Sequence, residues 1–324
     1  MNRFLSLAAC GLLALATAAS ADAPPAAPQS SFITLGTMGG PLPEPGRSQP
    51  ANALIVGPSV YLVDAGDGAV EQLIKSNIFL PQVKAVFISH LHFDHTGGLG
   101  AILGLRYQTN VPGALRIYGP PGTKALVDGL IASMKPGADA GYGLEGAGRV
   151  DPASTVAVTE LRDGASLRVD DMTVRAVKNT HYSFPAGSAD DRAFESLSFR
   201  FDLPDRSILY TGDTGPSDKV VALGKGADML VSEMIDIPAT VAAIGRIRPD
   251  LPESDRTAMI EHLSTHHLTP DQVGAMAQAM GVKSVVLTHL VVARADDARL
   301  ATYVAEIHKR YPGPVAPARD LDRF

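Results

Sequence analysis

The chain has 324 residues, of which 45% are hydrophobic, and this is enough for a sizeable core in one large domain or two smaller ones. The formal net charge of −6 and the absence of a basic run do not favour tight electrostatic binding to nucleic acid. Tryptophan is absent and aromatic residues are few, so there are few stacking platforms for single-stranded nucleic acid.

The N-terminal residues have the features of a secretory signal peptide. A positive charge at Arg3 precedes an apolar stretch that is too short to span a bilayer comfortably. The tripeptide at residues 19–21 is a cleavage site of the A-x-A type, so we expect cleavage after Ala21 and removal of the signal peptide, residues 1–21. Residues 22–30 are then a disordered spacer, and the mature protein is periplasmic or secreted.

Residues 31–324 are predicted to form one domain without disulfides. The one cysteine of the chain, Cys10, lies within the signal peptide, so the mature protein has no thiolate to act as a nucleophile or metal ligand. No segment after the signal peptide is long and apolar enough to anchor in a membrane.

The hydrophobic patterns that follow predict strands, then helices, then strands, then helices. Strands are expected at residues 32–37, 53–57, 60–66, 83–90, 114–119, 154–161, 172–181, 195–203, 206–213, 228–233 and 283–289. Helices are expected at residues 69–76, 99–105, 123–134, 217–226, 253–264, 270–280 and 298–311. This order predicts an α/β (α+β) fold in which two mixed sheets pack face to face with helices outside, a four-layer αββα sandwich.

Three loops remain whose conformation the sequence does not define, at residues 38–50, 136–153 and 182–195. Substrate choice is expected to depend on them. Met38, Tyr182 and Phe184 lie in or beside these loops and either line a pocket or pack in the ordinary way.

The stretch SHLHFDHTGGL, residues 89–99, follows an apolar strand and carries His90, His92, Asp94 and His95. Four ionisable groups at this position have no obvious packing role, whereas imidazole and carboxylate groups are metal ligands. Further candidates stand where other strands end, namely His181, Asp213 and His289. Alone, a histidine there is more often a polar cap and an aspartate a turn residue. Together the seven residues indicate a dinuclear metal centre.

The spacing suggests a division of ligands between two ions. His90 and His92 lie on one face of an extended backbone and would hold one ion with His181. Asp94 and His95 would hold the other with His289. Asp213 would bridge the two ions. This set suits two Zn²⁺, with Mn²⁺ or Fe²⁺ as alternatives. Such a pair supplies a bridging hydroxide as a nucleophile at neutral pH.

The chain resembles the metallo-β-lactamase-fold hydrolases through these seven residues and through VDAGDG, where Asp64 corresponds to the structural aspartate of that family. Within that superfamily it is most similar to the ribonuclease Z and arylsulfatase-like branch. The similar segments are LGTMGGP, IYGPPGT, RSILYTGDT and HHLTPDQVGAMAQAMGVKSVVLTH. The resemblance implies a homodimer.

In that branch, a histidine in an H-x-T motif and a glutamate protonate the leaving group. His267 and Glu233 match these positions, and the adjacent His266 leaves open which histidine acts. The sequence departs from ribonuclease Z at Ser232, where that family has a histidine, and it has no basic arm. Transfer-RNA processing is therefore not favoured.

The sequence predicts an exported, dinuclear zinc-dependent hydrolase of small esters, with a phosphodiester, phosphotriester or aryl sulfate as substrate. The catalytic residues are expected to be Asp94, which orients the attacking hydroxide, with His267 and Glu233. Alternative activities are a lactonase, a β-lactamase-type hydrolase or a ribonuclease Z-like nuclease. A metal-binding protein of the envelope is the non-enzyme alternative. His262 and His308 lie in helical stretches and are expected to be surface or packing residues.

Overall fold

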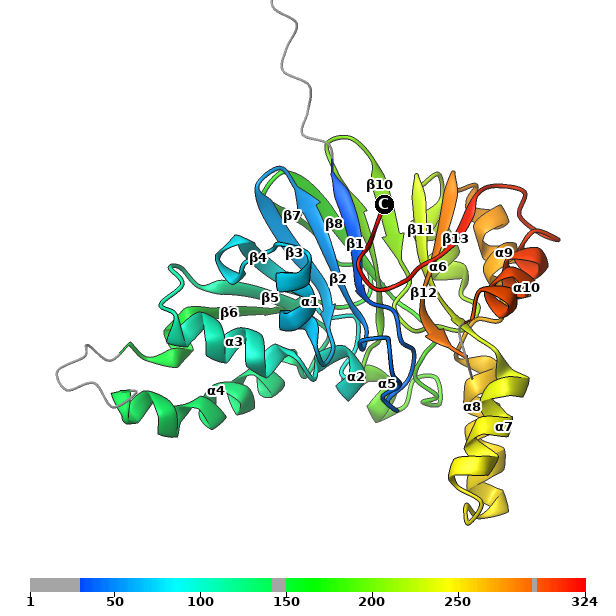
Figure 1. The fold of residues 1–324 in the computed structure, drawn as a ribbon, viewed down its shortest axis with the longest axis horizontal. Helices are drawn as coiled ribbons and strands as arrows, with labels where there is room; N and C mark the ends of the chain where they lie inside the picture. The colour runs from blue at the N-terminus through cyan, green and yellow to red at the C-terminus, as the bar shows by residue number, and fades with distance from the viewer. Residues whose placement is uncertain (1–29, 142–149, 293–295) are drawn as a thin grey trace, which may run out of the picture.

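The computed structural model describes residues 30–141, 150–292 and 296–324. Two seven-stranded sheets pack face to face in this part of the chain, and helices lie on their outer sides (Figure 1). The predicted four-layer sandwich is therefore confirmed. The predicted signal peptide lies outside the described residues, as do residues 22–29 of the predicted spacer. No helix among the described residues is long and apolar enough to cross a membrane.

The first sheet begins as an antiparallel meander and continues with parallel strands. Strands β1 to β3 pair antiparallel, whereas β3 to β6 pair parallel. In spatial order the strands are β14 (Asp322–Arg323), β1 (Ser31–Gly36), β2 (Ala51–Val56), β3 (Ser59–Ala65), β4 (Val83–Phe87), β5 (Leu115–Gly119) and β6 (Val156–Glu160). Four of the five residues of the parallel strand β4 are apolar and buried because both of its faces are covered, and only Lys84 is exposed.

The second sheet has the same mixed character. Strands β7 to β10 pair antiparallel, and β10 to β13 pair parallel. In spatial order they are β13 (Val315–Pro317), β12 (Ser284–Val291), β11 (Met229–Ile235), β10 (Ser207–Tyr210), β9 (Leu197–Asp202), β8 (Met172–Lys178) and β7 (Ser166–Val169). In β9, the buried side chains of Leu197, Phe199 and Phe201 alternate along the strand and face the first sheet.

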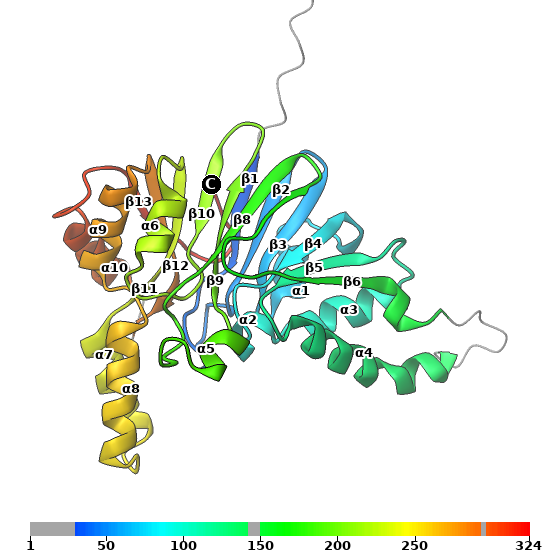
Figure 2. The ribbon, with the colours of Figure 1, turned by 180° about the vertical axis from the view of Figure 1, so that it is seen from behind.

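Helices cover the outer face of each sheet (Figures 1 and 2). The first sheet is covered by α1 (Ala69–Lys75), α3 (Leu99–Gln108) and α4 (Thr123–Asp139). The second is covered by α6 (Asp218–Gly224), α9 (Pro270–Met280) and α10 (Asp297–Ile307). The short elements are α2 (Phe93–Thr96), α5 (Ala189–Ala193), η1 (Leu80–Gln82) and η3 (Pro152–Thr155).

A helical hairpin projects from the sandwich (Figure 2). It consists of α7 (Ile237–Ile247) and α8 (Glu253–Thr265). The sequence prediction missed α7, whose β-branched residues such as Val241 and Ile244 also suit a strand. Asp236 caps this helix by accepting a hydrogen bond from the Ala239 N–H, and α8 packs against it.

The prediction of a loop at residues 136–153 is wrong in part, because α4 continues through Pro136 to Asp139. Proline lacks the N–H that a helix interior uses, so the sequence favoured a break there. The extra turn is supported by the buried Ala138 and by an ion pair of 2.7 Å between Lys135 and Asp139. Residues 142–149 of that loop lie outside the described residues.

Phe87 provides a test of the layer between the sheets. Its ring stacks on Tyr118 at 5.0 Å and meets Phe201 edge-on at 5.2 Å. We expect Phe87→Ala to lower the free energy of unfolding by about 3–5 kcal/mol, measured by urea denaturation, because a buried aromatic side chain leaves a cavity. Phe79→Ala is the control, since that side chain is 57% exposed and should change stability by less than about 0.5 kcal/mol.

Candidate metal centre and active site

Three of the predicted donors follow strands at the same spacing. His90, His181 and Asp213 each lie three residues after the end of a strand, namely β4, β8 and β10. His289 lies near the carboxyl end of β12 and has a positive φ of 44°. Side chains from both sheets therefore meet at one edge of the sandwich, on backbone held by rigid strands.

The segment after β4 places the remaining donors. His92 is the N-cap residue of α2, and Asp94 and His95 lie within that helix. Gly66 allows α2 to approach the end of β3, because a Cβ atom at that position would lie 2.2 Å from the Asp94 carbonyl oxygen. The short helix is therefore locked against the first sheet.

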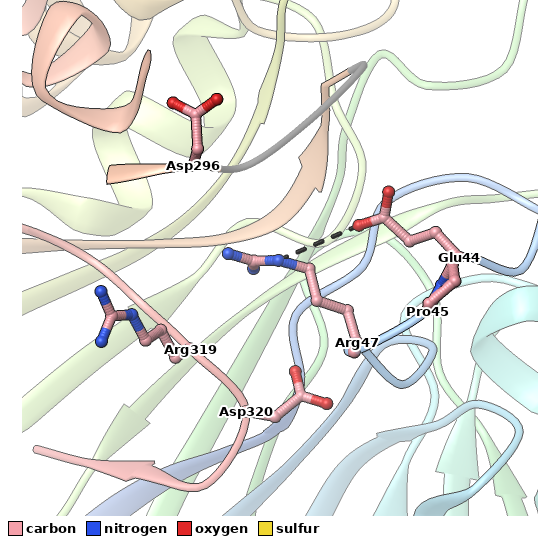
Figure 3. A pocket seen from close by; sticks show the side chains of 7 residues that line it. Glu44, Pro45, Arg47, Asp296, Arg319 and Asp320 are labelled. Atoms are coloured by element: carbon pink, nitrogen blue, oxygen red, sulfur yellow. Dashed lines mark ion pairs between the residues drawn. The ribbon is translucent and has the colours of Figure 1, made fainter. Parts of the chain in front are cut away.

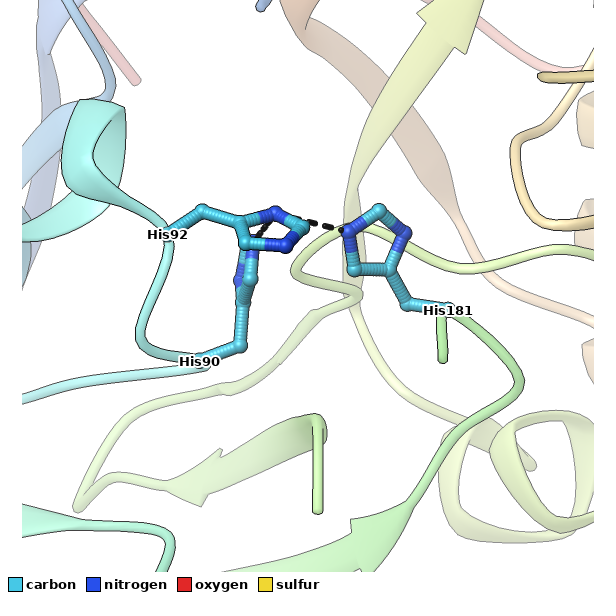
Figure 4. Close-up of side chains that lie close together, drawn as sticks. All are labelled: His90, His92 and His181. Atoms are coloured by element: carbon cyan, nitrogen blue, oxygen red, sulfur yellow. Dashed lines mark hydrogen bonds between the residues drawn. The ribbon is translucent and has the colours of Figure 1, made fainter. Parts of the chain in front are cut away.

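One group of donors consists of three histidines. The Nε2 atom of His90 lies 3.0 Å from Nδ1 of His92, which lies 3.1 Å from Nε2 of His181 (Figure 4). Burial lowers the pKa of His90 and of His181 well below the ordinary value, which favours the neutral imidazole that binds a metal. His92 is the exposed member of the group.

A second group consists of Asp94, His95 and His289. The Asp94 Oδ2 atom lies 3.6 Å from His95 Nε2 and 3.7 Å from His289 Nε2. Asp213 lies between the two groups, with Oδ1 3.3 Å from His95 Nε2 and Oδ2 3.2 Å from His289 Nε2. Its Oδ2 atom is also 3.9 Å from the Nε2 atoms of both His90 and His181.

These groups fit a bound cation. Among the described residues, His95 Nε2 and Asp213 Oδ1, which face the second group, are buried without a hydrogen-bond partner. A polar atom in such a position is costly unless something binds it. Nitrogen and carboxylate donors without sulfur match Zn²⁺, Mn²⁺ or Fe²⁺.

The local charge also favours a cation. Burial alone would raise the pKa of Asp213, but His289 and His95 hold it well below the ordinary value. Burial disfavours a charged His95, yet Asp213 and Asp64 raise its pKa well above the ordinary value. The surrounding carboxylates therefore stabilise positive charge at the position of the second group.

Asp64 orients His95 from behind. Its Oδ2 atom lies 2.8 Å from His95 Nδ1 and accepts hydrogen bonds from the Ser89 and Tyr210 hydroxyls at 2.8 and 2.7 Å. Its Oδ1 atom accepts from the Ser89 N–H at 2.7 Å. Contact with the carboxylate leaves Nε2 of His95 as the nitrogen that faces the donor group. Sequence reasoning did not single out Ser89 or Tyr210, although both stand close to predicted donors.

The predicted dyad is assembled beside these groups. His267 Nδ1 lies 2.7 Å from Glu233 Oε2, and Glu233 Oε1 accepts a hydrogen bond of 2.6 Å from the Thr214 N–H. Burial opposes protonation of His267, but the Glu233 carboxylate raises its pKa to about 9. His266 instead pairs through Nδ1 with the Thr180 carbonyl oxygen. The contact with Glu233 therefore favours His267 over His266 as the acid.

The other residues singled out from the sequence have different positions. His308 contacts the Tyr311 carbonyl oxygen at the end of α10, whereas Met38 is buried. The Tyr182 ring lies 5.6 Å from the His92 ring and so borders the site. His262, which was expected to be a surface or packing residue, lies on α8 with its ring 5.5 Å from the His181 ring. Nothing in the helical pattern of its segment signalled that position.

The loop at residues 38–50 is held between the site and a separate pocket of about 430 Å³ (Figure 3). Arg47 lines this pocket and donates hydrogen bonds to the Thr37 hydroxyl at 2.6 Å and the Ala318 carbonyl oxygen at 3.3 Å. Gly40 N lies 3.4 Å from His289 Nε2. The pocket is lined by none of the metal donors, and its arginine serves to anchor the loop.

The chain belongs to the beta-lactamase superfamily, because the family described as "Beta-lactamase superfamily domain" matches residues 60–290. Its metallo-β-lactamase fold and its donor groups define the class as a metal-binding hydrolase.

A relative named ribonuclease Z, from Mycobacterium bovis (strain BCG / Pasteur 1173P2), is 28% identical over 81% of this chain and 86% of its own length. The metallo-beta-lactamase fold protein YhfI of Bacillus subtilis is similar in structure, with a TM-score of 0.65 and 18% identity over 91% of this chain and 98% of that one. The short form of human tRNase Z has a TM-score of 0.62 and 22% identity, again over 91% and 98%.

Asp64 provides a test of the metal centre. We expect Asp64→Asn to weaken zinc binding by about 10- to 100-fold, because the substitution removes the carboxylate that orients His95. Asparagine tolerates the positive φ of 61° at this position, so the backbone can be retained. Binding is measured by titration in zinc-buffered solution.

Asp170→Asn is the matched control for this experiment. Asp170 has a φ of 50° and pairs with Arg116 at the protein surface. Equal zinc affinity in the two variants would contradict the orienting role of Asp64.

Proposed function

We propose that the protein is an exported, dinuclear zinc-dependent hydrolase of small esters. The observation that carries this proposal is the His267–Glu233 pair, with 2.7 Å between Nδ1 and Oε2, beside two converging groups of metal donors. A protein that only stored metal would need the seven donors, whereas a hydrolase also needs a proton donor, and His267, whose pKa Glu233 raises to about 9, can supply one. Export follows from the predicted signal peptide, and a homodimer stays a prediction.

The metal donors divide as the contacts suggest. His90, His92 and His181 would hold one ion, and Asp94, His95 and His289 would hold the other. Asp213 lies between the two groups and would contribute its carboxylate to both ions, because its oxygens face nitrogens of both groups. Two divalent cations at these positions would supply an activated water and offset negative charge on the ester oxygens.

The protein side chains then manage the protons of the reaction. Burial would raise the pKa of Asp94, but His289 and His95 lower it below the ordinary value, so this carboxylate stays ionised at neutral pH and can orient the water by accepting a hydrogen bond from it. His267 is protonated at neutral pH, and Glu233 occupies its Nδ1 atom. Its Nε2 atom is therefore the one that donates a proton to the departing alkoxide or phenoxide.

A phosphodiester, phosphotriester or aryl sulfate suits this arrangement, since an acid for the leaving group assists in-line displacement at phosphorus or sulfur. A ribonuclease is the second candidate, because a relative named ribonuclease Z matches over 81% of this chain. Against RNA as substrate, the net charge is −6 and Ser232 precedes Glu233.

An assay panel separates these activities. With zinc-loaded enzyme, we expect turnover of bis-p-nitrophenyl phosphate or p-nitrophenyl sulfate and little cleavage of a precursor transfer RNA. A homoserine lactone and a cephalosporin complete the panel. Turnover of the lactone alone would replace the ester proposal, cleavage of RNA alone would favour the ribonuclease, and turnover of none would favour a metal-binding protein.

Replacing the acid tests the mechanism. We expect His267→Ala to lower kcat by about 10²- to 10⁴-fold while both zinc ions stay bound, because only the proton donor is lost. The loss should be smaller for p-nitrophenoxide than for an alkoxide, which needs the proton more. His308→Ala, which changes a histidine remote from the site, is the control. Loss of zinc from the His267 variant would instead indicate a structural role.

A further inference from the structure

Exposed apolar side chains border the metal donors. In the described part of the chain, nine large apolar residues are exposed. Three of them lie on segments that carry or border the donors, namely Leu42 at 58%, Phe93 at 75% and Phe194 at 44% exposure. Single exposed apolar residues are common on proteins, but three of them on segments around one polar site are a reason to ask what they contact.

Phe93 is the most exposed of the three. It lies between the donors His92 and Asp94 on α2, and its ring packs over Gly97. The helix is held in place, because the Thr96 hydroxyl donates a hydrogen bond of 3.1 Å to the His92 carbonyl oxygen. The backbone of Phe93 is therefore held beside two predicted donors, and its side chain is exposed to solvent.

Phe194 connects to the same donors through other aromatic rings. Its ring lies 5.8 Å from that of Phe184, which lies 5.6 Å from that of Tyr182. Tyr182 in turn lies 5.6 Å from His92. The Tyr182 hydroxyl also accepts a hydrogen bond of 3.3 Å from the Leu91 N–H, which ties this loop to the donor segment. A continuous aromatic surface thus leads from His92 outward.

Leu42 lies on the segment that contacts the second donor group. Two residues before it, Gly40 N lies 3.4 Å from His289 Nε2, and the Gly39 N–H donates a hydrogen bond to the Leu290 carbonyl oxygen. Apolar side chains therefore project from segments that touch His92 on one side and His289 on the other.

We propose that Leu42, Phe93, Phe184 and Phe194, here called the apolar collar, bind an alkyl or aryl substituent of the ester substrate. This inference rests on the proposed function, since it takes the phosphoryl or sulfuryl group to lie at the metal donors. These side chains lie on segments that carry or contact the donors, so a substituent that extends from that group toward solvent can meet them. An apolar substituent would remove the collar from water, whereas a polar one would gain nothing from it.

Binding of phosphonates to the full-length, zinc-loaded protein tests the collar without turnover. Titration calorimetry compares hexylphosphonate with methylphosphonate, which share the group expected at the metals. We expect hexylphosphonate to bind at least about tenfold more tightly. Phe93→Ala and, separately, Phe194→Ala should reduce this ratio to about twofold. Zinc content is measured in each variant, so that loss of an ion is not mistaken for loss of an apolar contact.

Phe79→Ala is the matched control, because Phe79 is 57% exposed and lies away from the donors on the segment before β4. This variant should keep the full ratio. Equal binding of the two phosphonates by the unmodified protein would overturn the proposal, as would tighter binding of adenosine monophosphate than of hexylphosphonate, which would indicate a nucleobase site. The proposal would also be overturned if both collar variants kept the affinity ratio of hexylphosphonate to methylphosphonate. This includes the case in which the collar proves to be a contact between two copies of the chain.

The outcome is separable from that of the proposed function. Suppose that the unmodified protein prefers hexylphosphonate, that the collar variants lose this preference and that no ester is hydrolysed. The collar proposal then stands and the hydrolase proposal fails. If esters are hydrolysed while the ratio is flat, the hydrolase proposal stands and the collar fails.

Discussion

The buried carboxylate of Asp64 connects the parts of the molecule on which the site depends. It lies at the end of β3 in the first sheet, and it binds the Ser89 hydroxyl after β4, His95 on α2 and the Tyr210 hydroxyl from the second sheet. A carboxylate with no solvent exposure is tolerated only when hydrogen bonds satisfy its oxygens. The contacts that satisfy Asp64 are therefore the same ones that hold the two sheets together at the metal donors.

This connection explains why so many ionisable groups can stay buried. His90, His95 and Asp213 are almost inaccessible to solvent, and each would be costly to bury alone. Placed together, the carboxylates favour positive charge and the neutral imidazoles offer nitrogen donors. A cation bound between them would satisfy atoms that no hydrogen bond within the described chain reaches.

The two sides of the site have different chemistry. His267 and Glu233 form a polar side where a proton is held, with Nδ1 and Oε2 2.7 Å apart. Phe93 and Phe194 are exposed apolar side chains on segments that carry or border the donors. In a hydrolase with this arrangement, the reacting ester group of the substrate would lie beside the polar residues. An apolar substituent of the same substrate would contact the exposed phenylalanines.

Local sequence patterns were sufficient for most of the fold. The alternation of Leu197, Phe199 and Phe201 predicts a half-buried strand, and the apolar run before Ser89 predicts a fully covered one, because each pattern follows directly from strand geometry. The errors fell where tertiary contacts override a local preference. Packing against α8 stabilises α7 despite its β-branched residues, and an ion pair supports α4 beyond Pro136.

By itself, the sequence determined the candidate donors and the two-sheet architecture, because strand ends and the cluster from His90 to His95 are local features. Only the tertiary structure decided which side chains face one another. It placed Glu233 against His267, not His266, and it brought Tyr210 to Asp64 across 146 positions of the chain. It also placed His262 beside His181. These contacts depend on how two sheets and a helical hairpin meet in space, and no pattern within one segment records that.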